Sequence, residues 1–101
     1  MKDCCKEYLM SQFGDEDVVG EIYNEYVESL GQKLSESEAA IASQDWIALD
    51  RAAHALKGNA LAAGDEAVAN VAIELRNAAK LQKLDESKSL VAKIKELQAL
   101  L

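Results

Sequence analysis

Not one proline occurs in the 101 residues, and Ala, Leu, Glu and Lys, which have high helix propensities, are abundant throughout. No run of alternating Val, Ile or aromatic residues indicates a strand. The chain is therefore predicted to be all-α. Half of its residues are apolar, and this length suits one domain with one hydrophobic core, so we expect a single domain over residues 1–101.

Apolar residues recur at three- and four-residue steps and divide the chain into helices. Asp45 and Asp65 are suited to be N-caps, whereas Gly14 and Gly64 are suited to end helices. These signals predict a short helix over about 2–12 and four longer ones over about 16–43, 46–63, 66–80 and 84–101.

Four amphipathic helices joined by short turns pack most simply as an antiparallel up-down-up-down four-helix bundle, here over about 16–101. The short first helix is expected to cap one end of the core. Four of its apolar residues would form that cap, namely Tyr8, Leu9, Met10 and Phe13.

The net charge of −7 argues against several classes of partner. Nucleic acids and anionic membranes attract basic proteins, and no apolar run is long enough to span a membrane. Residues 1–6 lack the apolar region of a signal peptide, so we expect a cytoplasmic protein. Met1 and the absence of linker flanks favour a free-standing protein, and the single apolar stripe on each long helix favours a monomer. The adjacent Cys4 and Cys5 are expected to be reduced thiols, and no metal site is predicted.

The only histidine lies on the helix expected over 46–63. On a helical wheel, His54 lies opposite the apolar stripe that faces the core, which is formed by Leu49, Ala52, Leu56, Ala60 and Ala63. The neighbours of His54 on this outer face are at helical spacing: Ile47, Asp50, Arg51, Lys57, Gly58 and Leu61. We expect Ile47 and Leu61 to form an apolar rim, extended by residues of the first helix such as Leu9 or Met10.

Gly58 is unusual because glycine inside a helix costs about 1 kcal/mol relative to alanine. One explanation is close packing of a neighbouring helix. The other is that the missing side chain lets another molecule reach His54, with Lys57 beside it to attract an anion. An exposed imidazole with these neighbours suits a phosphoryl group carried on nitrogen and a protein docked over it.

The string Ala-His-Ala-Leu-Lys-Gly over residues 53–58, followed by Gly64, resembles the signature of histidine-containing phosphotransfer (HPt) domains. The resemblance implies that His54 is phosphorylated on Nε2 by the aspartyl phosphate of a response-regulator receiver domain and passes the group to another receiver. It also implies that Lys57 neutralises the phosphoryl charge and that Gly58 admits the receiver. The docking residues would be Ile47, Arg51 and Leu61. A sensor histidine kinase is a further possible partner.

Arg76 departs from the pattern of this family, in which many members have Glu or Gln twenty-two residues after the histidine. Those side chains can accept a hydrogen bond from Nδ1–H, but arginine has only donors. Arg76 could contact the phosphoryl group or point into solvent, and we favour the solvent-facing orientation.

Three functions are compatible with a helical domain of this kind. The first is a phosphotransfer module, which needs no catalytic apparatus or cofactor of its own because the receiver supplies Mg²⁺. The second is an adaptor that binds receivers or other partners without being phosphorylated. The third is a small enzyme, but the sequence has no nucleotide-binding loop, catalytic triad or di-metal motif. We favour the phosphotransfer module.

Overall fold

The computed structural model describes all residues from 1 to 101 and contains helices but no strand. The prediction of an all-α chain is confirmed. None of the helices has both the length and the apolar character needed to cross a membrane. The five helices are α1 (Asp3–Phe13), α2 (Glu16–Ser43), α3 (Trp46–Ala63), α4 (Glu66–Lys80) and α5 (Leu84–Gln98).

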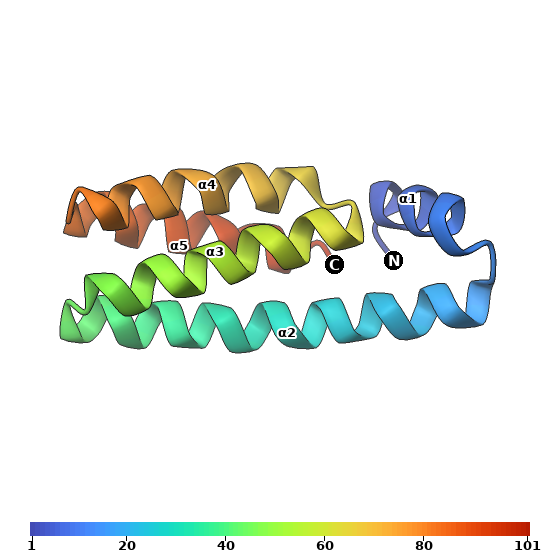
Figure 1. Ribbon diagram of the computed structural model, residues 1–101, viewed down its shortest axis with the longest axis horizontal. Coiled ribbons are helices and arrows are strands. Elements are labelled where there is room, and N and C mark those ends of the chain that lie inside the picture. The colour runs from blue at the N-terminus through green and yellow to red at the C-terminus, as the bar shows by residue number, and fades with distance from the viewer.

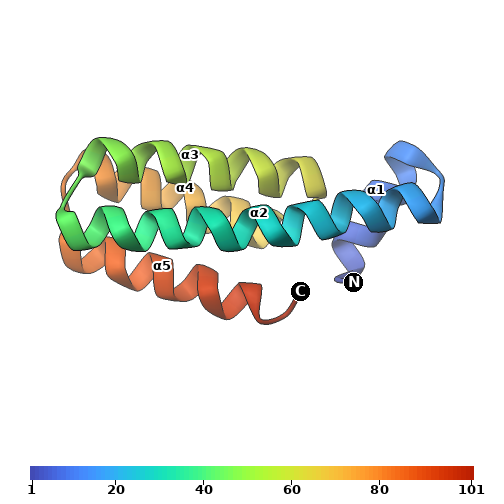
Figure 2. The same cartoon turned by 90° about the horizontal axis from the view of Figure 1, so that it is seen from below.

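The four longer helices lie side by side, and each runs opposite to the helix before it (Figure 1). Helix α3 packs on α2 and α4, while α5 packs on the other sides of α2 and α4. Helix α2 extends beyond the other three, and α1 folds back against this extension and against α3 (Figures 1 and 2). Helices α3 and α4 pack against each other and together form one face of the bundle, which we call the α3–α4 face.

The helix ends lie at the residues that local chemistry favours. The side chains of Asp15, Asp45 and Asp65 accept hydrogen bonds from backbone N–H groups in the first turns of α2, α3 and α4. Gly14 and Gly64 follow α1 and α3 with φ angles of 69° and 76°, a left-handed conformation that costs glycine little. These caps explain why the predicted helix bounds agree with the observed ones to within a few residues.

One hydrophobic core runs the length of the bundle and contains 22 buried residues. Every long helix contributes large side chains that are fully or nearly fully buried, because their spacing places them on one face. Examples are Leu30 of α2, Leu49 and Leu56 of α3, Leu75 of α4 and Ile94 of α5.

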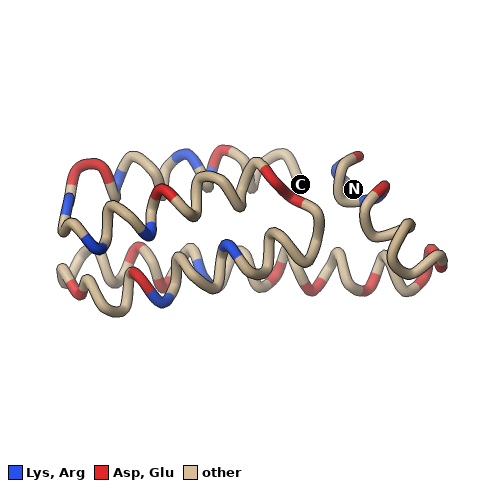
Figure 3. Tube along the Cα trace, turned by 45° about the horizontal axis from the view of Figure 1, so that its top comes forward, with Lys and Arg blue, Asp and Glu red and all other residues tan.

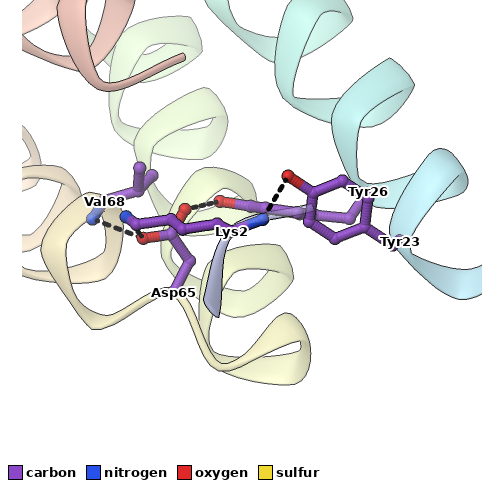
Figure 4. Close-up of polar contacts among 5 residues, drawn as sticks. All are labelled: Lys2, Tyr23, Tyr26, Asp65 and Val68. Atoms are coloured by element: carbon purple, nitrogen blue, oxygen red, sulfur yellow. Dashed lines mark hydrogen bonds and ion pairs between the residues drawn. The ribbon is translucent and has the colours of Figure 1, made fainter. Parts of the chain in front are cut away.

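A buried polar cluster ties the N-terminal segment to the turn between α3 and α4 (Figure 4). The carboxylate of Asp65 is fully buried; its Oδ1 lies 2.8 Å from Lys2 Nζ, and its Oδ2 accepts a hydrogen bond of 2.8 Å from Tyr26 Oη. Oδ1 also accepts the capping bond from Val68 N–H at 3.3 Å. The backbone N–H of Lys2 donates to Tyr23 Oη. One carboxylate thus joins residues from three separate parts of the chain.

Burial and the Asp65 carboxylate shift the pKa values of groups around this cluster. Burial raises the pKa of the Cys5 thiol to about 12, and it raises the pKa of Tyr26 further above its usual range, with the hydrogen bond to Asp65 adding to that shift. Burial lowers the pKa of Lys2, but the hydrogen bond and the charge of Asp65 outweigh it, so the net shift is upward. Cys5 is a buried free thiol and Cys4 an exposed one.

Candidate functional site

His54 lies in the middle of α3 with an exposed side chain. The residues expected to form the core stripe of this helix are all buried: Leu49, Ala52, Leu56, Ala60 and Ala63. The helical wheel therefore predicted correctly which face of α3 meets the core. The imidazole of His54 is accessible to another molecule from outside the bundle.

Gly58, one turn after His54, borders open space. A Cβ built on Gly58 would have no neighbouring atom within 4 Å, so close packing of another helix does not explain this glycine. Lys57 is half-buried, and its ammonium is in none of the ion pairs of the chain. Lys57 and the open space at Gly58 thus lie three and four residues after His54, a spacing that places them one turn from it on the helix.

Exposed apolar side chains flank His54 along the α3–α4 face. Ile47 is 69% exposed and Leu61 is 49% exposed, as expected for the rim, whereas Arg51 is exposed toward α2, where it lines a groove with Lys33 and Glu36. Ile73 of α4, which the sequence reasoning missed, is 43% exposed. The sequence could have indicated Ile73, because it lies three residues before Arg76 and residues at that spacing share a helix face.

Helix α1 agrees with the prediction only in part. Leu9 is fully buried and Met10 is partly buried against the core, as expected for a cap, so neither residue extends the exposed rim. Tyr8 and Phe13, expected to cap the core, are 39% and 52% exposed. Tyr8 instead lies over Gly64, where an added Cβ would be 2.5 Å from Tyr8 Cβ, and it lines a groove that also includes Leu61.

The orientation favoured for Arg76 was wrong, because its guanidinium turns toward α3 instead of into solvent. Arg76 Nη1 lies 3.1 Å from His54 Nδ1, and Arg76 Nε donates to Asp50 Oδ1 at 3.0 Å. Asp50 precedes His54 by one turn, so the two residues present their side chains on the same face of α3. Arg76 is therefore part of the immediate surroundings of His54.

The charges are distributed unevenly along the molecule. The extension of α2 beside α1 carries acidic residues and no basic ones (Figure 3). In the sequence, no Lys or Arg occurs between Lys6 and Lys33, whereas that stretch holds Glu7, Asp15, Glu16, Asp17, Glu21, Glu25 and Glu28. The basic residues Lys57 and Arg76 belong to the α3–α4 region that contains His54, whereas Arg51 of α3 lines a groove against α2.

Comparison with protein families gives a match between residues 21–101 and the model of the Hpt domain. Comparisons with curated proteins and with solved structures gave no match. The matched region includes His54, Lys57 and Gly58 together with the four longer helices, except for the first five residues of α2. Hpt domains act in phosphotransfer in two-component phosphorelays, and the family generally interacts with response-regulator receiver domains. The match extends over most of the chain, and the protein belongs to the Hpt domain family.

Proposed function

We propose that His54 carries a phosphoryl group on Nε2 and relays it between aspartates of receiver domains. The observation that carries this proposal is an exposed imidazole on α3 beside open space at Gly58, within a chain of the Hpt family. In the loading step, the Nε2 lone pair attacks the phosphorus of an aspartyl phosphate. An N–P bond forms, the P–O bond breaks, and the aspartate leaves as a carboxylate.

The chain supplies the nucleophile and a docking surface, and the receiver supplies Mg²⁺ and the acidic pocket that phosphoryl transfer requires. In this proposal the protein is a carrier without a cofactor of its own. Lys57 neutralises charge on the phosphoryl oxygens, and Gly58 leaves room for the receiver. The receiver docks on Ile47, Arg51 and Leu61, with Ile73 extending this surface onto α4.

We place this relay in the cytoplasm, where a monomer would exchange phosphoryl groups with receivers and with a sensor histidine kinase. The negative charge of the chain supports protein partners over nucleic acids, because nucleic-acid affinity depends on basic residues.

Incubation with a panel of receivers labelled with phosphate on their aspartates tests the proposal. We expect at least one receiver to transfer its label to the protein as acid-labile, base-stable phosphate. An adaptor without phosphotransfer would bind a receiver and gain no label, and that outcome would replace the relay by the adaptor function.

Charge on the apolar rim should weaken docking. Replacing Ile47 by Asp is expected to reduce receiver affinity about thirtyfold, roughly 2 kcal/mol, because the new carboxylate would be desolvated under the partner. The measurement is titration of a receiver that accepts or donates phosphate, with transfer rate as a second readout. Leu100→Asp is the matched control, because Leu100 is equally exposed and follows α5, which does not pack on α3. Unchanged affinity of a folded Ile47→Asp protein would place the docking surface elsewhere.

A large side chain at Gly58 should separate stability from transfer. Gly58→Leu is expected to stabilise α3 by up to about 1 kcal/mol through helix propensity, while obstructing the approach to His54 and slowing transfer at least tenfold. Gly58→Ala is the control, since it brings the propensity gain but adds only a methyl group. Melting temperature and transfer rate are measured together. A marked loss of stability, or wild-type transfer by the leucine variant, would contradict the access role of Gly58.

A further inference from the structure

Arg76 connects the two helices of the site through two contacts from one guanidinium. Its Nε donates to Asp50 Oδ1 at 3.0 Å, and its Nη1 lies 3.1 Å from His54 Nδ1. The side chains of Arg76 and Asp50 are each about one-third exposed, so both contacts lie at the surface where a partner can reach them. The roles proposed above for His54, Lys57 and Gly58 do not involve these two contacts.

The chemistry of the guanidinium determines the direction of the contact with the histidine. Arginine has only N–H donors, so a hydrogen bond between Arg76 and Nδ1 requires Nδ1 to be the acceptor. A neutral imidazole has one protonated and one unprotonated nitrogen. While Arg76 occupies Nδ1, the proton of a neutral His54 is therefore on Nε2, the nitrogen that must attack phosphorus.

On the basis of the proposed function, we propose that Arg76, anchored by Asp50, is a positioning residue that holds neutral His54 in the tautomer with its proton on Nε2. By keeping Nδ1 an acceptor, Arg76 opposes loading of the phosphoryl group before a receiver docks and opposes its loss afterwards. Transfer in either direction therefore requires that Arg76 first leave Nδ1.

Loading requires that the ring proton be on Nδ1 so that Nε2 has a free lone pair. Arg76 must first leave Nδ1, after which the imidazole exchanges its proton through water from Nε2 to Nδ1. Nε2 then attacks phosphorus, the N–P bond forms, and the receiver aspartate departs with the electrons of the P–O bond. The Nδ1 proton passes to water, and Arg76 again donates to the vacated lone pair.

Unloading needs the reverse proton movement. When Nδ1 takes a proton from water, the N–P bond can break with its electron pair returning to Nε2, and the imidazole leaves as a neutral group. The incoming nucleophile is the carboxylate of a receiver or, in spontaneous hydrolysis, a water molecule. While Arg76 donates to Nδ1, a protonated Nδ1 would have its N–H directed at another donor. Arg76 therefore disfavours protonation of Nδ1 and slows hydrolysis of the N–P bond.

Nitrogen NMR of His54, the only histidine, tests the first half of the proposal without any receiver. In the neutral wild-type protein, Nε2 is expected to show the signal of a protonated nitrogen and Nδ1 that of an acceptor. Arg76→Met should shift this tautomer balance toward Nδ1–H, and Arg76→Lys should restore part of it. Lys80→Met is the control, because it removes a positive charge from an exposed site one turn away on α4. A proton on Nδ1 in the wild-type protein would overturn the proposal.

The lifetime of the phosphohistidine tests the second half. The full-length protein is phosphorylated with phosphoramidate, and loss of phosphate is followed at one mildly acidic pH. Arg76→Met is expected to shorten the half-life about tenfold, the factor typical of one charge-assisted hydrogen bond, whereas Lys80→Met should stay within about twofold of wild type. Equal half-lives for Arg76→Met and wild type would overturn the proposal.

Asp50→Asn provides a second variant, because it keeps Arg76 but weakens its anchor. Its expected effect on tautomer and half-life has the same direction as that of Arg76→Met and is smaller. Since this ion pair is partly exposed, neither change should lower the melting temperature by more than about 4 °C. Failure of every receiver to label His54 would overturn the proposed function, whereas the tautomer and half-life readouts would still report on Arg76.

Discussion

Replacing His54 by Gln is expected to abolish phosphorylation of the protein by receiver domains. The amide of Gln offers no nitrogen lone pair that can form a stable N–P bond, and the chain has no second histidine. Because His54 is exposed, the unfolding free energy should change by no more than about 0.5 kcal/mol. Labelled phosphate on the protein and urea-induced unfolding followed by circular dichroism are the two measurements.

The same experiment distinguishes phosphotransfer from a purely structural histidine. Receiver binding by the His54→Gln protein is the control, and it should persist because the apolar rim on α3 and α4 is unchanged. Acid-labile phosphate retained by the variant would place the phosphorylated residue elsewhere. A large loss of stability would show that the imidazole supports the fold, contrary to its position opposite the buried Leu56.

Replacing Asp65 by Ala is expected to lower the free energy of unfolding by about 3–5 kcal/mol. The change removes an acceptor that is fully buried, leaves the Tyr26 hydroxyl buried without its partner, and removes the opposite charge from Lys2. It also removes the N-cap of α4, which contributes about 1 kcal/mol of this total. Urea denaturation of the full chain measures the effect.

Asp45→Ala is the matched control for Asp65→Ala. Asp45 caps α3 by accepting a similar hydrogen bond from Ala48 N–H at 3.0 Å, but its side chain is exposed and has no further partner. Asp45→Ala should lower the free energy of unfolding by about 1 kcal/mol. If the two variants lose equal stability, the contacts of Asp65 with Lys2 and Tyr26 contribute nothing beyond the cap.

The sequence alone was sufficient for the helices and for the orientation of α3. Helix bounds depend on residues a few positions apart. Asp45 caps α3 by accepting a hydrogen bond from Ala48 N–H, and Gly64 ends the same helix. Burial along one helix follows from its 3.6-residue period, which placed Leu56 inside and His54 outside. The exposure of Ile47 and Leu61 followed from the same period.

The tertiary structure alone decided which side chains meet across helices. Arg76 reaches a histidine 22 residues earlier, and Asp65 binds Tyr26 and Lys2, which precede it by 39 and 63 residues. Helical periodicity gives the face on which each residue lies, but the contact depends on how far one helix slides along the next and how it is rotated. The packing of α4 on α3 turned Arg76 toward His54, and the packing of α1 against the bundle buried Leu9. These distances depend on the shape of the whole core, so no short stretch of the sequence contains them.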